Sequence, residues 1–225
     1  MIQLFKTFKS TKGNSLAEFA VTAAMMATLA TTAAPRFAGV GETGKQNQTK
    51  SNLEKLGKMA EQFYMNKLSP SSDANPAGEG QGRLPAQDRY DEKIGGYERL
   101  TDLEAVLDGT FDKWSDGEGS NWRSVFGLET SNPDYTSEYQ FIDTDNDGTY
   151  GPSEWFSYLS ESEGSIKSPY SQGHYIYTVI KGGQKEYRNP TTGLMELTDC
   201  NECGPILVIA DAYNPTKYYL VKSFN

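Results

Sequence analysis

The feature that most constrains this chain is an uncharged apolar segment near its start, at residues 19–35. Three lysines within residues 6–12 precede it, and a single carboxylate, Glu18, stands directly before it. Lysines ahead of an apolar segment hold the start of a chain in the cytoplasm. A lone acid at the start of a membrane helix is costly because hydrocarbon cannot solvate it, so such an acid usually has a partner. The best candidate partner is a new α-amino group, made by cutting the chain after Gly13.

These residues resemble the class III leader of type IV pilins and of the pseudopilins of type II secretion. The resemblance implies that a prepilin peptidase cuts after Gly13 and that the mature chain begins at Asn14, where the family usually has a methylated Phe or Met. Glu18 is then the fifth mature residue and Pro35 the twenty-second, as in the family. The resemblance is most specific over residues 6–37.

The resemblance also implies the function, a structural subunit of a type IV pilus or pseudopilus-like surface filament. Residues 14–45 would span the inner membrane before assembly and form the filament core afterwards, with the rest of the chain on the cell surface or in an extracellular filament. Glu18 would pair with the Asn14 amine of an adjacent subunit. The implied partners are further copies of the chain in a helical filament, other pilins or pseudopilins, the prepilin peptidase and the inner-membrane assembly machinery.

An ordinary secretory signal peptide is the main alternative, because it also has a basic start, an apolar middle and small residues near its cut site. The residues TTAAP, at 31–35, would supply that site. Glu18 opposes this interpretation, since an acid hinders insertion. The protein would then be a secreted, calcium-stabilised binding module. An exported hydrolase with unrecognised acidic residues is a third, more distant alternative.

The composition argues against two further classes of function. The formal net charge is −9, which disfavours nucleic acid as a partner because binding it depends on basic groups that displace counterions. The chain has one histidine, His174, so histidine-based catalysis and histidine-rich zinc sites are not expected. We expect no enzymatic activity.

Hydrophobic periodicity predicts an α+β fold that is rich in loops. Residues 14–68 read as one long helix, bent near Pro35 because proline removes a backbone hydrogen bond. Its second half is amphipathic, with apolar residues at helical spacing: Leu53, Leu56, Ala60, Phe63 and Tyr64. Residues 69–99 read as a long surface loop, and residues 101–108 as a short helix with a capping box from Thr101 to Glu104. The expected organisation is a leader at 1–13, a membrane or filament-core helix at 14–45, and an exported globular domain at 46–225.

Strand signals gather near the end of the chain. Residues 174–181 alternate and are β-branched, and a turn at Gly182-Gly183 leads from them into 184–188. Residues 205–212 are a near-continuous apolar run, and 217–224 alternate again. The second half of the long helix is expected to pack on the small antiparallel sheet that these strands form.

The sharpest motif is an acidic loop at residues 143–154 that fits the EF-hand loop at positions 1, 3, 5, 6 and 12. Calcium prefers six to eight oxygen ligands, and alternate residues of a tightly curved loop point their oxygens inward. The expected Ca²⁺ ligands are Asp143, Asp145, Asp147, the Thr149 carbonyl and a bidentate Glu154. Residues 153–161 look helical, but 135–142 do not clearly do so, so we expect a calcium loop without a complete EF-hand pair. A solvated acidic turn is the alternative.

Two cysteines, Cys200 and Cys203, stand just before the apolar strand. In an exported protein, a small local disulfide is the simplest interpretation. Free thiols are the alternative, and a redox role is less favoured because that motif needs a helix at the first cysteine.

Overall fold

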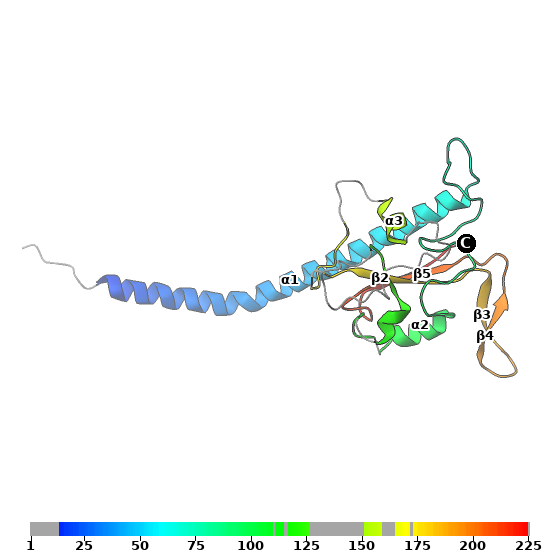
Figure 1. Cartoon of the computed structure of the whole chain (residues 1–225). Coiled ribbons are helices and arrows are strands. Elements are labelled where there is room, and N and C mark those ends of the chain that lie inside the picture. The colour runs from blue at the N-terminus through cyan, green and yellow to red at the C-terminus, as the bar shows by residue number, and fades with distance from the viewer. Residues whose placement is uncertain are drawn as a thin grey trace, which may run out of the picture. The chain divides into compact units, whose positions relative to one another are not determined.

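The structure is a computed structural model, and it describes residues 14–109, 111–114, 117–126, 151–158, 165–171 and 173–224, with the backbone alone for residues 14–40, 117, 120 and 151. The chain divides into two compact units, Met1–Gln46 and Asn47–Asn225, which we describe separately. In the first unit the backbone is helical from Asn14 onward (Figure 1). Among the described residues, none of the helices has the length and apolarity needed to cross a membrane.

Helix α1 is assigned over Asn14–Leu68 and supplies one wall of the second unit. Its buried residues there include the predicted apolar face: Leu53, Leu56, Ala60, Phe63 and Tyr64. Gly57 lets this face approach the sheet closely, because a Cβ at that position would lie 2.6 Å from Cδ2 of Leu220. The predicted amphipathic half of the helix is therefore confirmed, whereas its membrane or filament-core half stays a prediction.

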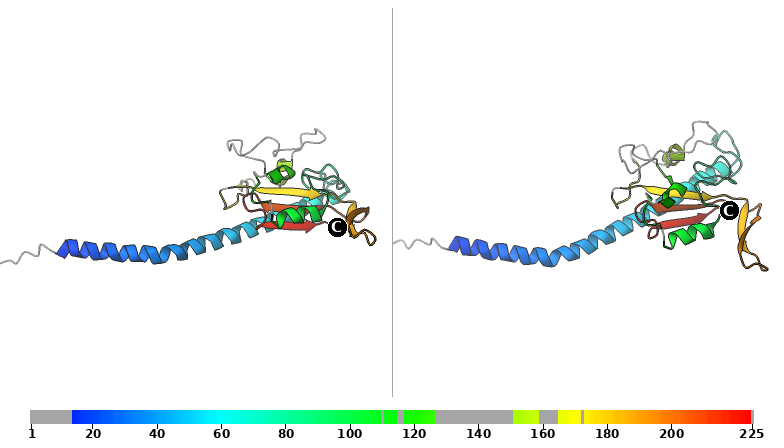
Figure 2. Two further views of the ribbon diagram at one scale, coloured as in Figure 1. Left: turned by 90° about the horizontal axis from the view of Figure 1, so that it is seen from below. Right: turned by 60° about the horizontal axis from the view of Figure 1, so that its bottom comes forward.

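The main sheet is antiparallel and has the strand order β1-β2-β5-β6 (Figure 2). Its strands are β1 (Arg123–Ser124), β2 (Tyr175–Ile180), β5 (Ile206–Asp211) and β6 (Tyr219–Ser223). The three predicted strand regions at 174–181, 205–212 and 217–224 are confirmed, and together with α1 they make the fold α+β. The short edge strand β1 lies in a region for which the sequence predicted no strand.

Each face of this sheet is buried by a different part of the chain, because successive strand residues point to opposite faces. One core cluster contains α1 residues together with Tyr175, Tyr177, Val179, Leu207 and Ile209. The other contains Ile176, Val208 and Ala210 together with residues of helix α2 (Leu100–Leu107) and the aromatic residues Phe111, Trp114 and Trp122. The complete burial of β2 and the near-complete burial of β5 explain why their sequences are almost continuously apolar.

A separate two-stranded sheet is formed by β3 (Gln184–Arg188) and β4 (Met195–Asp199). The sequence predicted a turn at Gly182-Gly183 that leads from 174–181 into 184–188. Gly183 adopts a positive φ of 77°, but the strands on either side of the turn are not partners, since β2 pairs with β5 and β3 pairs with β4. The Gly183 N–H instead donates to the Cys203 carbonyl at 2.7 Å, which directs the hairpin away from the main sheet.

The connecting segments agree with the sequence in part. Residues 69–99 contain no helix or strand beyond isolated bridges, as predicted. The prediction that the whole segment lies on the surface is wrong, because its second half contributes buried side chains: Arg83, Leu84, Gln87, Ile94 and Tyr97. Helix α3 spans Gly151–Phe156. It overlaps the region predicted as helical, 153–161, but begins two residues earlier, and the last three residues of that region lie outside the described part. A short 3₁₀ helix, η1, covers Gly117–Asn121.

The predicted capping box of α2 is wrong. The residue before the helix is Arg99, whose side chain makes no capping hydrogen bond, and Thr101 already lies inside the helix. The first N–H groups of a helix need acceptors, and here Glu186 of β3 provides them: its Oε1 accepts hydrogen bonds from the backbone N–H groups of Leu100 and of Thr101, the latter at 3.2 Å.

Candidate functional site

The structure describes only some of the residues that were predicted to act in processing, assembly and calcium binding. Asn14 is the first residue of α1, and Glu18 and Pro35 lie in the stretch described by its backbone alone. Gly13 and four predicted calcium ligands lie outside the described residues: Asp143, Asp145, Asp147 and Thr149. Glu154, the last predicted ligand, is described in full. The candidate site therefore consists of Glu154 and the residues that contact it.

Glu154 lies in α3 with its side chain turned into the protein, 7% exposed. Its Oε1 accepts a hydrogen bond from Nη1 of Arg83 at 2.8 Å, and its Oε2 accepts one from the backbone N–H of Ala86 at 2.6 Å. Both oxygens therefore already have donors from the segment between α1 and α2. The next residue, Trp155, packs edge-on against Tyr177 of the main sheet, which fixes α3 to the core.

Arg83 is the centre of a buried charged network. Its Nε and Nη2 donate to the two oxygens of Glu79 at 2.7 and 2.9 Å, and its Nη1 also donates to the Gln87 carbonyl at 2.9 Å. Its guanidinium lies over the Phe63 ring of α1, 5.1 Å from the ring centre. Lys67, which also lies over that ring, bonds Glu79 at 2.6 Å. One arginine thus connects α1, the loop after it and α3.

The two carboxylates of this network differ in their surroundings. Burial raises the pKa of Glu154, although Arg83 and the Ala86 N–H act in the opposite direction. Burial acts on Glu79 in the same sense, but hydrogen bonds from Arg83 and Lys67 outweigh it and lower the pKa of that group. The guanidinium itself is held charged, since its contacts with both carboxylates raise the pKa of Arg83 in spite of its burial.

The contacts of Glu154 limit how it could hold calcium. A cation bound by both Glu154 oxygens would lie near the positive guanidinium of Arg83, or Glu154 would have to leave Arg83. Carboxylate oxygens have spare lone pairs, so sharing is chemically feasible at an electrostatic cost. In the described parts of the chain no three His, Cys, Asp or Glu side chains come together as a metal-binding group. The calcium site stays a prediction.

A second candidate site is a cavity of about 420 Å³ between α2, the β3–β4 hairpin and one end of the main sheet. Apolar side chains from all three elements form much of its lining: Leu100, Ile180, Met195, Leu197 and Ile206. Glu104 and Lys185 also line it. Because Glu186 bonds the start of α2, and the Arg99 guanidinium donates to the Met195 carbonyl at 3.2 Å, the two walls are tied to each other.

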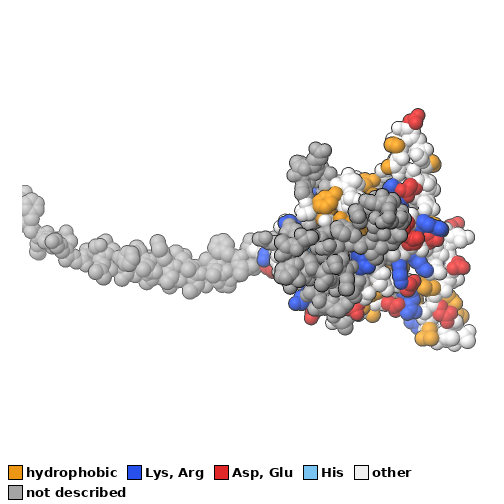
Figure 3. All heavy atoms as spheres, viewed as in Figure 1, with side chains coloured by type: hydrophobic (Ala, Val, Ile, Leu, Met, Phe, Trp, Pro, Cys, Tyr) orange, Lys and Arg blue, Asp and Glu red, His pale blue; other side chains and the backbone are white. Residues whose placement is uncertain are grey.

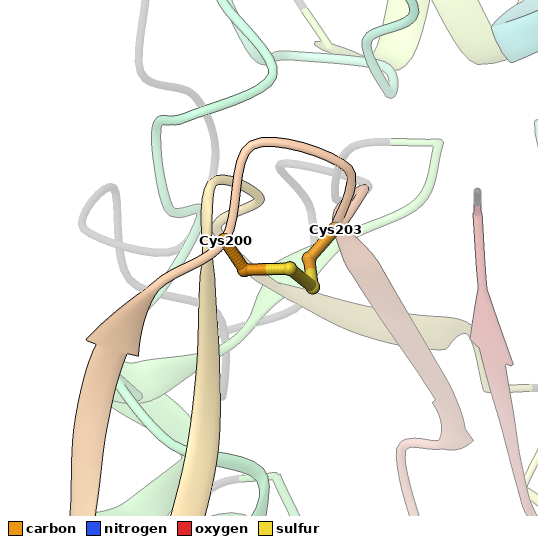
Figure 4. The surroundings of a disulfide bond; sticks show 2 residues. All are labelled: Cys200 and Cys203. Atoms are coloured by element: carbon orange, nitrogen blue, oxygen red, sulfur yellow. A yellow bond between two sulfur atoms is a disulfide. The ribbon is translucent and has the colours of Figure 1, made fainter.

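The base of the hairpin is held by the cysteine pair. Cys200 and Cys203 are joined by a disulfide, with their Cα atoms 5.4 Å apart (Figure 4). The Cys200 N–H donates to the Gly183 carbonyl at 2.9 Å, so the disulfide loop also holds the start of β3. Cys203 lines the cavity as well.

Sequence reasoning missed Arg83, Glu79 and Glu186. The first two stand in a glycine-rich loop where no helical or strand period marks a buried side chain. Glu186 lies in an alternating segment that was read only as a strand. The four-residue spacing of Glu79 and Arg83 is a weak signal, because outside a helix it predicts no contact.

Comparisons of the chain with protein-family models, with curated proteins and with solved structures found no match.

Proposed function

We propose that this protein is a structural subunit of a surface filament of the type IV pilin or pseudopilin kind, assembled through its N-terminal helix. The observation that carries the proposal is the order of residues at the start of the chain. A basic leader ends in Gly13, Glu18 follows as the fifth residue of the proposed mature chain, and an uncharged segment runs from there to Pro35.

The proposed helix has two halves with different tasks. The half over residues 14–45 lies in the inner membrane until assembly and then packs against the same helix of neighbouring copies. Its Ala and Thr residues suit this task, because small side chains let helices approach closely. The half from residue 46 onward holds the globular domain, which is supported by its packing on an antiparallel sheet.

Glu18 supplies the axial register in this proposal. After cleavage by the prepilin peptidase, the Asn14 amine carries a positive charge that a neighbouring copy offers to Glu18. A carboxylate surrounded by apolar helices is costly unless it is paired, so only a register that brings amine and acid together is stable. The inner-membrane machinery lifts each copy into this register, and the domain ends on the cell surface.

Calcium stabilises the globular domain in this proposal. Asp143, Asp145, Asp147, Thr149 and Glu154 would supply its ligands. An acidic loop without a cation is destabilised by repulsion between its carboxylates, so the ion would order the loop. One loop suits a permanent structural ion better than a sensor, since sensing loops act by opening a helix pair.

N-terminal sequencing and intact mass of the mature protein test this proposal. A start at Asn14, with or without an added methyl group, supports the filament subunit. A start near Pro35 or Arg36 supports the alternative, a secreted calcium-stabilised binding module released by signal peptidase. The two functions are distinguished by whether the mature protein retains the apolar helix.

A further inference from the structure

The β3–β4 hairpin carries an apolar group at its tip and has an apolar cavity at its base. Leu194, in the turn between the strands, is 66% exposed, the largest exposed fraction among the large hydrophobic side chains of the described residues. Figure 3 shows hydrophobic side chains at the end of the projecting hairpin. The cavity at the base, about 420 Å³, is large enough for a leucine side chain. The same molecule therefore presents a projection and a recess of matching chemistry.

The two features carry one pair of opposite charges, alongside Lys181 and Lys185, which also line the cavity. The α2 wall of the cavity carries Glu104, and the outer end of β3 carries Arg188. Both side chains are exposed, and neither forms an ion pair with another described side chain. An arginine near an inserted tip would meet an acid at the mouth of the recess. Complementary charges of this kind orient partners and suppress wrong pairings.

The cavity also contains a hydrogen-bond acceptor without a donor. Oε1 of Gln184 is buried and accepts no hydrogen bond from the described residues. A buried acceptor that lacks a donor is costly, so a group that enters with a hydroxyl is favoured. The hairpin turn offers such a group near Leu194 at Thr191, whereas the Thr192 hydroxyl already donates to Glu196 at 3.3 Å.

We propose that the hairpin tip of one copy, led by Leu194, inserts into the cavity of a second copy, with Arg188 facing Glu104. The tip and the recess are different surfaces, so the contact is head-to-tail and leaves a free tip and a free recess at the two ends. Contacts of this type generate open helical arrays. The inference rests on the proposed filament function and adds to it a contact between globular domains.

An engineered cysteine pair tests the contact in the full-length chain. Leu194→Cys and Glu104→Cys are introduced together, and sheared filaments are oxidised and separated without reductant. The native cysteines are already paired within the chain, so a disulfide between copies must come from the engineered cysteines. The expected result is a ladder of dimers, trimers and larger species. The control pairs Leu194→Cys with Asp73→Cys, which is exposed in a different loop, and should stay monomeric.

Charge and apolarity are tested by assembly yield. Leu194→Asp should reduce assembled protein about ten- to hundredfold, because the apolar burial of one leucine is lost. Met65→Asp, at a comparably exposed α1 residue, should not. Glu104→Arg or Arg188→Glu alone should lower the yield about two- to fivefold. The two changes together should restore it, and a double variant no better than the single ones overturns the proposal.

The outcomes separate this inference from the proposed function. Filaments that form normally but give no crosslinked ladder overturn the inference alone. Dimers that never extend to trimers also overturn it, because they indicate a two-fold contact. If the unmutated chain forms no filaments, the proposed function fails. The cysteine pair is then oxidised in detergent-solubilised full-length protein, where a ladder supports the contact and its absence overturns it.

Discussion

The guanidinium of Arg83 and the carboxylate of Glu154 are joined by a 2.8 Å ion pair across 71 positions of sequence. Arg83 belongs to the loop after α1, and Glu154 belongs to α3 at the end of the predicted calcium loop. Their contact therefore decides where the end of that loop is held. Both side chains are largely removed from solvent, so neither tolerates the loss of the other.

Removing Arg83 should destabilise the folded protein strongly. Arg83→Met leaves Glu154 buried without its charged partner, and breaking one side of such a pair costs about 3–5 kcal/mol. The measurement is the free energy of unfolding in urea. Arg89→Met is the matched control, because the pair between Arg89 and Asp91 is exposed and should contribute less than about 1 kcal/mol. Equal effects of the two substitutions would contradict the buried network.

Calcium should raise the melting temperature of the full-length protein, and chelator should lower it. At free calcium one hundred times the dissociation constant, linkage gives about 2.7 kcal/mol. Asp145→Ala should remove the difference between the two conditions. Glu154→Ala should remove it as well, but it also unpairs Arg83, so the Asp145 variant is the cleaner test. If the unmutated protein melts identically with calcium and with chelator, the predicted ion does not bind.

Glu186, rather than Glu104, should be the acid that stabilises α2. Glu186 accepts hydrogen bonds from Leu100 and Thr101 at the start of the helix. Glu186→Ala should cost about 1–2 kcal/mol, the usual cost of losing a cap. Glu104→Ala, which removes the acid of the capping box predicted from sequence, should change the unfolding free energy by less than about 0.5 kcal/mol. If Glu104→Ala is instead the more destabilising substitution, the capping box predicted from the sequence does stabilise the helix.

The protein should lose stability in mild acid through His174. Its ring packs edge-on against Trp114, with 5.3 Å between ring centres, and burial lowers the pKa of His174 to about 4. The unfolded chain takes up the proton near pH 6.5, whereas the folded protein resists it until about pH 4, so stability falls as the pH decreases between these values. Between pH 6.5 and 5 the loss should reach about 1.5 kcal/mol. In His174→Gln this slope should disappear from denaturation curves, and an unchanged slope would show that other groups cause it.

Glu18 should matter for assembly and little for folding. Glu18→Ala should leave the melting temperature unchanged while filaments are lost or strongly reduced, because the proposed partner of the Asn14 amine is gone. Glu54→Ala, an exposed acid further along α1, should assemble normally. A normal filament yield from the Glu18 variant would count against the register mechanism. A bulky residue at position 13 should instead leave the uncut precursor in the membrane.

The regular spacing of apolar residues made part of this fold predictable. The recurrence of Leu53, Leu56 and Ala60 located the buried face of α1, because helical periodicity needs no knowledge of the partner surface. The continuous apolar run of β5 indicated a strand buried on both faces. Strand β4 carried no such signal, since its residues are at most half-buried.

Contacts between distant residues were not predictable from one sequence. The end of the calcium loop suggested a free ligand at Glu154, but its partner Arg83 comes from a loop without periodicity. Similarly, α2 has a local capping pattern that β3 overrides, because the Glu186 carboxylate is a stronger acceptor than a threonine hydroxyl. In both cases the missing information was which charged side chain the tertiary fold brings close.

The way in which the hairpin joins the main sheet has a mechanical consequence. It leaves from the end of β2 and returns to the start of β5, and these strand ends are direct partners, Ile180 with Ile206. A pull on the tip is therefore delivered to both central strands at the same end and in the same direction. Such a load does not slide β2 past β5, so their mutual hydrogen bonds are spared. Tension passes instead to the hydrogen bonds between β5 and β6 and to the packing of α1 and α2 on the two faces of the sheet. Many weak contacts resist it there together.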